Sequence, residues 1–257
     1  MMAKLDNLDK YNLDHLHSAV SAGEPLNREV VEQFRKHFNL TVRDGYGQTE
    51  STLLIGFLKD TEQRPGSMGK AIPGSRVAVV DDEGNKVDTN VKGNIALPLD
   101  FPGLFKGYFK DEKRTKDAHA GDYYITGDLA HIDEDGYFWF EGRRDDIIIS
   151  SGYTIGPFEV EDALTNHEAV KECAVVASPH PIRGNIVKAF IILKEGYKPS
   201  DDLVKELQTF SKKVVAPYKY PRAIEFVEDL PKTNSGKIRR VELREAERTK
   251  HNNAQNK

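Results

Sequence analysis

The sequence predicts an α/β segment, then a β-rich segment, then a small α+β domain. Three patterns predict this order. Apolar residues recur at helical spacing in 28–37, short apolar runs alternate with Asp- and Gly-rich turns in 66–141, and strand-like runs alternate with helix-like runs after Gly142. The change of pattern near Gly142 predicts two domains, 1–141 and 142–257.

The first segment is predicted to contain one helix and one short strand. The helix covers 28–37, and Asn27 is a suitable N-cap because its side-chain oxygen can accept a hydrogen bond from a backbone N–H of the first turn. A short strand is expected at 41–43, and it leads into a polar loop over 44–50.

Two hairpins built around acidic turns are predicted in the β-rich segment. The predicted strands are 76–80 with 86–87, 93–97, and 130–132 with 137–140. The second turn, Asp133-Glu134-Asp135-Gly136, has the composition of a calcium loop, but the ligand spacing and the distal Glu of such a loop are missing. We therefore expect a solvated turn at this position.

The second domain is predicted to pack its helices on one sheet. Pro157 falls in the first turn of a helix, where its missing N–H costs no hydrogen bond. The tail from Glu247 to Lys257 is polar, and we expect it to be frayed. The predicted strands are 147–150, 173–177, 189–193 and 223–227, and the predicted helices begin at 157, cover 201–214, and begin at about 239.

The composition excludes several classes of protein. Of the 257 residues, 38% are hydrophobic and 30% are charged, as in globular chains, and the net charge of -4 gives no bulk attraction for nucleic acid. No apolar run approaches the roughly 20 residues that span a bilayer, and the first residues do not resemble a signal peptide. The single cysteine, Cys173, excludes an intrachain disulfide and is expected to be buried. These features suit a cytoplasmic protein.

Two stretches of the first domain carry groups suited to a nucleotide. In Tyr46-Gly47-Gln48-Thr49-Glu50, an aromatic ring, a hydroxyl and a carboxylate could contact a purine, a phosphate and Mg²⁺. In Ser21-Ala22-Gly23-Glu24-Pro25, the glycine permits a planar ligand to approach the backbone. Taken alone, the first could be an ordinary polar loop and the second a turn before a helix.

Two further stretches lie at a predicted strand end and at the domain boundary. Tyr124-Ile125-Thr126-Gly127-Asp128 ends in a carboxylate that could accept hydrogen bonds from both hydroxyls of a ribose, or could simply cap a turn. Gly142-Arg143-Arg144-Asp145-Asp146 is either a surface salt-bridge cluster or a hinge that absorbs backbone rotation. It is followed by Ser150-Ser151-Gly152-Tyr153.

The last stretch, Leu230-Pro231-Lys232-Thr233-Asn234-Ser235-Gly236-Lys237-Ile238-Arg239, presents a lysine on a loop. It is not a Walker loop, because the earlier glycine is missing and Ile238 replaces the required Ser or Thr. A flexible loop suits a lysine that must reach an anionic centre. The alternative is an exposed basic turn.

The order of these stretches resembles that of the acyl-CoA synthetases in the adenylate-forming superfamily. Between the first and third lies Gly66-Ser67-Met68-Gly69-Lys70-Ala71-Ile72-Pro73-Gly74, and the stretches at 105–109, 155–161 and 216–222 are similar to medium-chain acyl-CoA synthetases. The resemblance implies the C-terminal part of the adenylate-forming fold, with α/β and α+β portions. These are the end of the large N-terminal domain with its β-rich subdomain, then a small mobile C-terminal domain.

The resemblance also implies a two-step reaction that uses ATP, Mg²⁺ and CoA. A carboxylic acid, expected to be a fatty acid, attacks the α-phosphorus of ATP and gives acyl-AMP and pyrophosphate. The C-terminal domain then rotates, and the CoA thiol attacks the acyl carbonyl to give acyl-CoA and AMP.

The implied site residues fall in both domains. In the first, Gly23, Glu24, Pro25 and Tyr46 would line the adenine, Asp128 would hold the ribose with Arg143 nearby, Thr49 would contact phosphate, and Glu50 would bind Mg²⁺. In the second, Asp145 would be the hinge, Lys237 the catalytic lysine of adenylation, Ser151, Gly152 and Tyr153 the pantetheine path, and Arg183, Lys212 and Tyr220 the contacts to the CoA nucleotide.

The sequence departs from the family pattern in two ways. No Ser/Thr/Gly-rich phosphate loop ending in Pro-Lys is found, and the region that supplies most of the acyl pocket is missing too, so we expect the chain alone to be largely inactive in adenylation. Thr154 stands where the family commonly has Arg after Ser-Gly-Tyr. Two alternatives stay open: an adenylation enzyme that loads a carrier protein, and a non-catalytic nucleotide- or CoA-binding module or half of a split enzyme.

Overall fold

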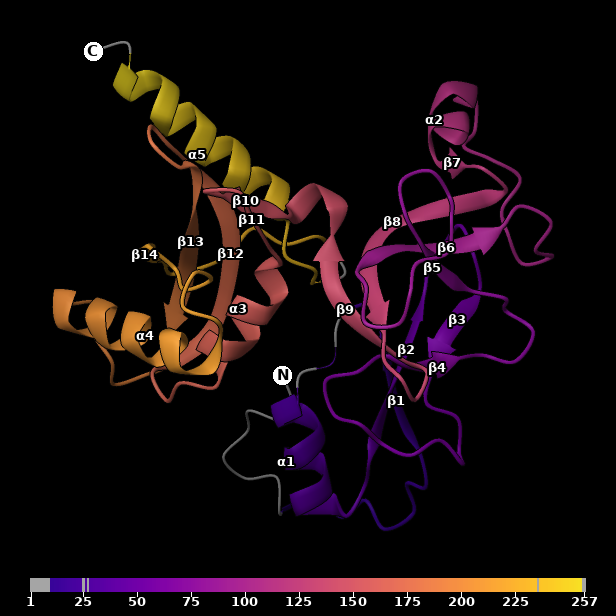
Figure 1. Ribbon diagram of the computed structural model, residues 1–257. Coiled ribbons are helices and arrows are strands. Elements are labelled where there is room, and N and C mark those ends of the chain that lie inside the picture. The colour runs from indigo at the N-terminus through magenta and orange to yellow at the C-terminus, as the bar shows by residue number, and fades with distance from the viewer. Residues whose placement is uncertain (1–9, 25, 27, 235, 256–257) are drawn as a thin grey trace. The chain divides into compact units, whose positions relative to one another are not determined.

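The computed structural model in Figure 1 describes residues 10–24, 26, 28–234 and 236–255. The chain forms two compact units, Met1–Glu141 and Gly142–Lys257. Each unit has its own sheet and its own buried core. None of the helices in the described part of the chain is long and apolar enough to cross a membrane.

The first unit is built on a nine-stranded sheet in the order β1-β2-β3-β4-β9-β8-β6-β5, with β7 paired to β8. Among the described strands of this unit, β1 and β2 form the only parallel pair, and α1 (Arg28–Phe38) connects them. The strands are β1 (Ala19–Ala22), β2 (Val42–Gly47), β3 (Leu53–Gly56), β4 (Gly69–Ala71), β5 (Ala78–Val80), β6 (Gly93–Pro98), β7 (His119–Ala120), β8 (Tyr123–Ile132) and β9 (Tyr137–Arg143).

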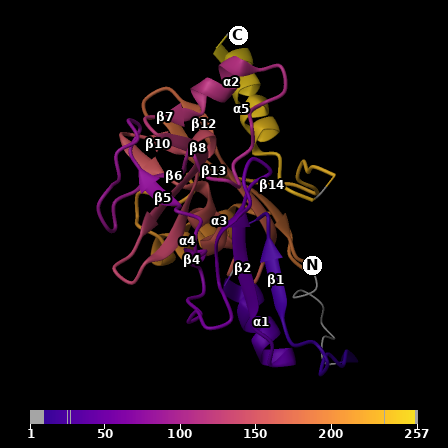
Figure 2. The same cartoon turned by 90° about the vertical axis from the view of Figure 1, so that its right-hand side faces the viewer.

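Helix α1 lies beside β1 and β2 in both views of the ribbon (Figures 1 and 2). Val31 on the helix and Val42 on β2 are buried, so the apolar face of the helix covers this end of the sheet. The predicted helix is confirmed. Its predicted cap, Asn27, lies outside the described residues.

The core of the first unit lies under β3, β6 and β8. Leu54, Ile95, Leu97 and Tyr124 are buried there and belong to one apolar cluster. Removing such side chains from water is the main favourable contribution to folding, at about 25 cal/mol per Å² of apolar surface. Short α2 (Glu112–Asp117) buries no residue and is capped by Asp111, which accepts from Arg114 N.

Strand β2 is longer than predicted. Residues 44–47 were expected in a loop, but they continue the strand because they pair with β1 on one side and β3 on the other. Gly47 is needed there, since a Cβ at this position would lie 2.2 Å from the carbonyl oxygen of Thr52. The two glycines of this segment have low strand propensity, and tertiary pairing overrides it.

The first predicted hairpin is confirmed in a shortened form. Val80 bridges to Lys86, and Asp81 N donates to Asn85 O at 2.8 Å. Asp81 also accepts from the backbone N–H groups of Glu83 and Asn85, which closes the turn. The second hairpin is confirmed as β8 and β9.

The second unit has a five-stranded sheet in the order β11-β10-β13-β12, with β14 parallel to β13. The strands are β10 (Ile148–Ser150), β11 (Tyr153–Ile155), β12 (Val170–His180), β13 (Gly184–Leu193) and β14 (Ala223–Phe226). The helices are α3 (Pro157–Thr165), α4 (Asp201–Val214) and α5 (Arg240–Gln255), and a 3₁₀ turn, η3, covers Arg144–Asp146. The predicted α+β domain packed on one sheet is confirmed.

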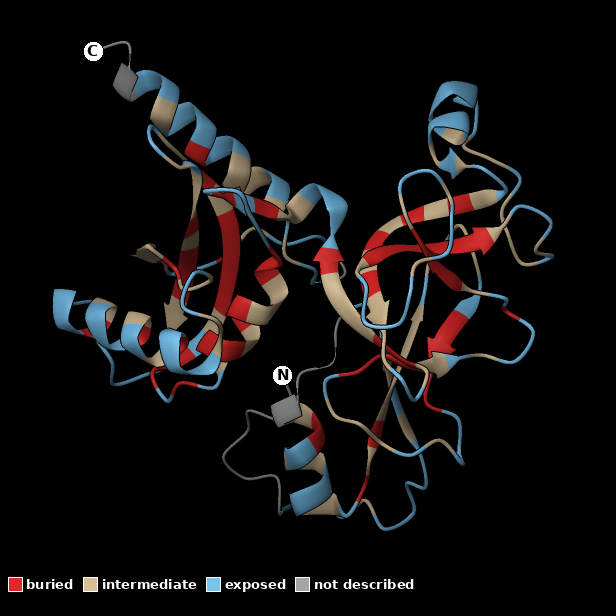
Figure 3. Ribbon diagram, viewed as in Figure 1, coloured by how far each residue is buried: buried red, intermediate tan, exposed pale blue. Residues whose placement is uncertain are grey.

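Strand β12 divides the core of this unit between two faces. Cys173 and Val175 belong to the cluster that includes Leu164 of α3 and Leu207 of α4, whereas Ala174 and its alternate neighbours face the α5 side. Figure 3 shows β12 largely buried and the outer surface of α4 exposed. Cys173 is free and buried, as predicted.

Helix α5 is anchored between Arg240 and Lys250 and continues to Gln255, so the fraying predicted from Glu247 is wrong for the described residues of the tail. The Glu247 side chain is buried, and its carboxylate accepts hydrogen bonds from Ser178 Oγ at 2.8 Å and from Lys188 Nζ at 2.8 Å. Nearer the start of the helix, Arg240 binds both carboxylate oxygens of buried Glu161 at 2.9 and 2.6 Å. A polar tail therefore remains helical because its charges are paired with the sheet and with α3.

Candidate functional site

The Thr-Gly-Asp stretch forms a β-bulge within β8, not the strand end that was expected. Asn94 pairs with Leu129 and Ala96 pairs with Ile125, so three residues of β8 lie opposite Ile95 alone. Gly127 takes a φ of 78°, which favours glycine. Thr126 Oγ1 fixes the bulge by donating to Ile95 O at 2.8 Å.

The bulge holds Asp128 in a buried position beside β2. Tyr46 Oη donates to Asp128 Oδ2 at 2.7 Å, and Gln48 Nε2 donates to the same oxygen at 2.6 Å. Gln48 is oriented by a second hydrogen bond to Thr126 O at 3.0 Å. The structure thus brings together two predicted residues, Tyr46 and Asp128, that are 82 positions apart in the sequence.

Thr49 and Glu50 follow β2 in a turn closed by Ser51 N and Gln48 O at 3.1 Å. Thr49 is exposed, and Glu50 is half-buried with Oε1 accepting from Tyr108 Oη at 3.0 Å. No partner of the second Glu50 oxygen is found among the described residues.

Glu50 and Thr49 are groups that could hold a magnesium ion together with a phosphate. Within the described part of the chain, no group of three or more His, Cys, Asp or Glu side chains could hold a metal. Glu50 would therefore supply one carboxylate oxygen, beside the hydroxyl of Thr49. Mg²⁺ is often bound in this way, through one or two carboxylates with phosphates and water.

Gly23 and Glu24 follow β1 directly. Gly23 has a φ of 94°, and Ala22 pairs with Gly45, which places this turn next to the segment of β2 that carries Tyr46. Pro25 lies outside the described residues.

A half-buried carboxylate, Asp44, lies on β2 opposite Ser21 of β1. A small pocket is lined by Asp44 and by apolar residues that include Leu26, Val31 and Phe57. Burial raises the pKa of Asp44 to about 6, although the backbone N–H groups of Gly45 and Leu26 act in the opposite direction.

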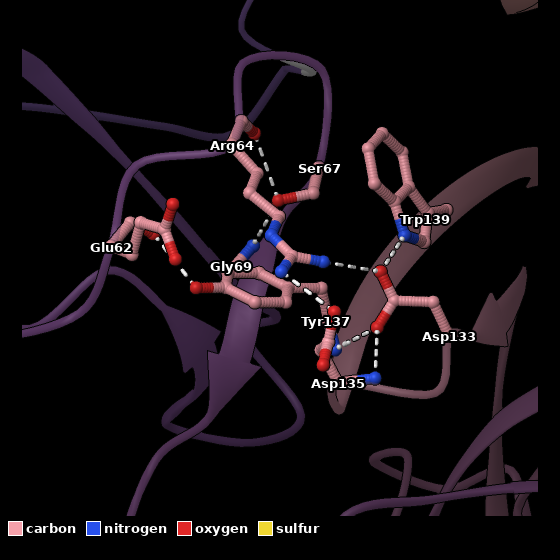
Figure 4. A network of polar contacts seen from close by, with 8 residues as sticks. All are labelled: Glu62, Arg64, Ser67, Gly69, Asp133, Asp135, Tyr137 and Trp139. Atoms are coloured by element: carbon pink, nitrogen blue, oxygen red, sulfur yellow. Dashed lines mark hydrogen bonds and ion pairs between the residues drawn. The ribbon is translucent and has the colours of Figure 1, made fainter.

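In the acidic turn that had the composition of a calcium loop, the Asp133 and Asp135 carboxylates bind other groups of the protein (Figure 4). Asp133 Oδ1 accepts from the backbone N–H groups of Asp135 and Tyr137, and Oδ2 accepts from Trp139 Nε1 at 2.9 Å and Arg64 at 3.3 Å. Burial would raise the pKa of Asp133, but these hydrogen bonds and the Arg64 charge outweigh it and lower the pKa. Glu134 and Asp135 are exposed, so the predicted solvated turn is confirmed, and Asp133 adds a hydrogen-bond network at its base.

In the second unit, Ser151 and Gly152 form the two-residue turn between β10 and β11. Their φ values of 51° and 84° are both positive, as a tight turn that matches strand twist requires. Arg183 donates to Ser151 Oγ at 3.0 Å, and Tyr153 stacks on Tyr218 with ring centroids 4.4 Å apart. The predicted pantetheine residues and Arg183 thus share one surface.

Lys212 and Tyr220 form a second group. The Lys212 ammonium lies 4.0 Å from the centroid of the Tyr220 ring, and Arg222 donates to Tyr220 Oη at 2.9 Å. Within the described residues, no hydrogen bond or ring contact joins this group to Arg183.

Lys237 is exposed and directly follows the turn at the end of a closed loop. Lys232 bridges to Ile238, Thr233 N donates to Lys237 O at 2.8 Å, and Gly236 takes a φ of 88°. The base of the loop is fixed by Leu230, which is buried. The Lys237 ammonium has no ion-pair partner in the described part of the chain.

The predicted hinge residue Asp145 is exposed within η3, and Arg143 precedes this turn in an extended conformation. Asp146 accepts from Arg244 of α5, which ties the end of η3 to the second unit. Gly142 has a φ of 130°, a value that favours glycine at this point.

Three residues near the carboxylates were not singled out from the sequence. Gln48 stands inside the predicted motif, and its role depends on a contact with β8. Tyr108 and Tyr124 stand in quoted stretches, but no spacing rule indicates that their hydroxyls meet between Glu50 and Gln48.

Residues 1–109 match the family described as AMP-binding enzyme, and residues 159–237 match the AMP-binding enzyme C-terminal domain. The chain belongs to this family of adenylate-forming enzymes. The two matched segments occur in the order that the motifs indicated, and the chain corresponds to the C-terminal portion of acyl-CoA synthetases.

The chain is similar to several named proteins. The uncharacterized acyl-CoA ligase YtcI of Bacillus subtilis is 63% identical over 247 residues, covering 96% of this chain and 47% of the relative. The mitochondrial acyl-coenzyme A synthetase ACSM3 of Mus musculus is 51% identical, covering 94% and 43%. A crystal structure of the anthranilate CoA ligase AuaEII with anthranoyl-AMP superimposes with a TM-score of 0.88 at 36% identity, covering 95% and 47%. The chain thus spans about half the length of the relatives it matches.

Proposed function

We propose that this chain supplies the nucleotide-binding, lysine-bearing and CoA-binding parts of an acid:CoA ligase. The reaction joins a carboxylic acid, of the fatty acid class, to CoA and consumes ATP. In the first step, a carboxylate oxygen bonds to the α-phosphorus of ATP while the bond from that phosphorus to pyrophosphate breaks. In the second step, the CoA thiol loses its proton and its sulfur bonds to the acyl carbon, while the bond from that carbon to AMP breaks. The relatives named as acyl-CoA synthetases or ligases support this assignment.

The single observation that carries the proposal is the position of Asp128. Its carboxylate is held by two donors, Tyr46 and Gln48, on a bulge of β8. A fixed carboxylate is suited to accept hydrogen bonds from both hydroxyls of a ribose. Gly23 and Glu24 follow β1, which pairs with the β2 segment that carries Tyr46. They would contact the adenine together with Tyr46. Arg143 would lie near the ribose.

Lys237 would stabilise the charge that develops between the carboxylate and the α-phosphate. A fixed ammonium aimed at a developing charge is worth more in a water-excluded site than in bulk water. Glu50 would hold Mg²⁺ and Thr49 would contact phosphate; the ion would offset the phosphate charge when bound. Rotation about Asp145 would withdraw Lys237 before the thiol attacks.

The aromatic and basic surface of the second unit would bind CoA. Ser151, Gly152 and Tyr153 would line the pantetheine path. Arg183, Lys212 and Tyr220 would contact the nucleotide, because guanidinium and ammonium groups bind phosphates through charge-assisted hydrogen bonds.

Titration calorimetry with AMP tests the nucleotide site. We expect the wild-type chain to bind AMP and Asp128→Asn to bind at least tenfold more weakly, since a hydrogen bond to a charged group is worth about 1.5–3 kcal/mol. Asp122→Asn, an exposed carboxylate of the same unit, is the matched control. Equal affinities of wild type and Asp128→Asn would refute the ribose assignment.

The two half-reactions test Lys237. In an active full-length context, Lys237→Ala should abolish most acyl-AMP formation and leave thioester formation from supplied acyl-AMP nearly unchanged. Equal loss in both half-reactions would contradict the assignment. For the chain alone, we expect acid-dependent pyrophosphate exchange far below that of full-length relatives, because its sequence has no Ser/Thr/Gly-rich phosphate loop.

A further inference from the structure

The two carboxylates assigned to ribose and metal are joined by a chain of hydrogen bonds. Gln48 donates to Asp128 at 2.6 Å, and Gln48 Oε1 accepts from Tyr124 Oη at 3.4 Å. Tyr124 also hydrogen-bonds to Tyr108, whose hydroxyl donates to Glu50 Oε1 at 3.0 Å. We call the three connecting side chains, Gln48, Tyr124 and Tyr108, the Gln–Tyr–Tyr bridge.

The donors in this bridge point outward toward both carboxylates. Tyr108 donates to Glu50, and the Gln48 amide N–H donates to Asp128, so each carboxylate acts only as an acceptor. Tyr124 stands in the middle: its hydroxyl donates to Gln48 Oε1 at 3.4 Å and also interacts with the Tyr108 hydroxyl. Ionised carboxylates suit this pattern, and they are the forms that would bind a metal and accept from ribose hydroxyls.

The bridge is also rigid. Tyr124 is 1% exposed, and Phe105 packs edge-on against Tyr124 and Tyr108 at centroid distances of 5.4 and 4.9 Å. The Arg114 guanidinium lies 3.8 Å above the Tyr108 ring. Burial, followed by the neighbouring Tyr108, Glu50 and Asp128, raises the pKa of Tyr124 well above its ordinary value, so its hydroxyl remains a neutral donor.

Backbone hydrogen bonds also hold the segments that carry Tyr108 and Glu50 together. Phe105 N donates to Glu50 O at 2.8 Å, and Tyr108 N donates to Thr115 Oγ1 at 2.9 Å. The segment before α2 is therefore attached to the turn after β2 through main chain and side chain together.

We propose that the Gln–Tyr–Tyr bridge positions Glu50 and Asp128 as one rigid pair, so that metal–phosphate binding and ribose binding are coupled through Tyr124. This rests on the proposed nucleotide-binding function. Tyr108, Tyr124 and Gln48 are positioning residues: they act through the two carboxylates and need not touch the nucleotide.

Calorimetry on the full 257-residue chain tests the coupling. The affinities for AMP with EDTA, for ATP with EDTA and for ATP with Mg²⁺ are measured for each variant, and the ratio of the two ATP affinities gives the metal effect. Tyr108→Phe should reduce the metal effect about five- to tenfold and leave AMP affinity within about twofold. Tyr124→Phe should weaken both, because it removes the central hydroxyl. Tyr137→Phe, which loses a hydroxyl bound to Glu62 O at 3.0 Å elsewhere in the unit, is the control.

The outcomes separate the two proposals. If wild type binds neither AMP nor ATP, the proposed function fails and the coupling fails with it. If wild type binds and Asp128→Asn weakens binding, but the Tyr108 and Tyr124 variants match Tyr137→Phe, the coupling alone is overturned. Absence of any Mg²⁺ effect in wild type also overturns it. Retained fluorescence of Trp139 establishes that each variant has folded.

Discussion

Asp44 gives the first unit a stability that depends on pH. Its pKa is raised from 3.8 to about 6, chiefly by burial, so the folded state disfavours the ionised form. The sign follows from linkage: this contribution is fully present below pH 3.8 and is lost as the pH rises through about 6. The pKa difference corresponds to about 3 kcal/mol in total.

Asp44→Asn removes this titration while keeping the shape of the side chain. Between pH 4 and pH 7.5, we expect the unfolding free energy of the variant to rise by about 2 kcal/mol relative to wild type, because part of the titration lies below pH 4. At the lower pH the two proteins should differ little.

Urea unfolding followed by Trp139 fluorescence measures this difference. Trp139 is the single tryptophan of the chain and lies on β9 of the first unit, so its signal is specific to that unit. Asp133→Asn is a control of opposite sign, since the pKa of Asp133 is lowered and its stabilisation is present at neutral pH. A difference between Asp44→Asn and wild type that does not change with pH would refute the reasoning.

Three further predictions concern the stability of the two units. Leu207→Ala, at a fully buried site of α4, should destabilise the second unit by about 2–5 kcal/mol in thermal unfolding, and exposed Leu53→Ala should cost far less. Arg240→Ala leaves the buried Glu161 carboxylate without its cation and should cost about 3–5 kcal/mol in urea unfolding; recovery in Arg240→Ala with Glu161→Gln would support this cause, and no recovery would contradict it. Gly47→Ala should lower the thermal midpoint of the first unit because of the contact with Thr52 O, and an unchanged midpoint would contradict the close approach.

Much of the second unit could be predicted from local sequence. Helix α4 was predicted with its observed bounds, and the structure shows that its start is fixed locally: Ser200 Oγ accepts from Leu203 N at 3.1 Å, a contact within one turn. Pro157 marked the start of α3 for a similar local reason. Strand β11 was missed, because three residues after a tight turn carry little periodicity.

The first unit depends more on long-range pairing, and its site was harder to predict. The extension of β2 through Gly45 and Gly47 contradicts local propensity, since neighbouring strands on both sides supply the hydrogen bonds. The motif predicted Tyr46 and Asp128 as site residues, but their contact spans 82 positions and joins β2 to β8, which are not neighbours in the sheet, so no local pattern indicates it. The bulge at Gly127 likewise depends on the partner strand β6.

The bulge in β8 limits the insertions and deletions that this part of the gene could tolerate. Since three residues lie opposite Ile95, the loss of a single codon within 126–128 would shift the rest of β8 by one position and reverse which side of the sheet Ala130 and its neighbours face. Deleting two codons would restore the alternation of side chains between the two faces of the sheet, but it would remove the bulge that holds the Asp128 carboxylate. Insertions and deletions should therefore accumulate in the surrounding turns and be absent from this tripeptide.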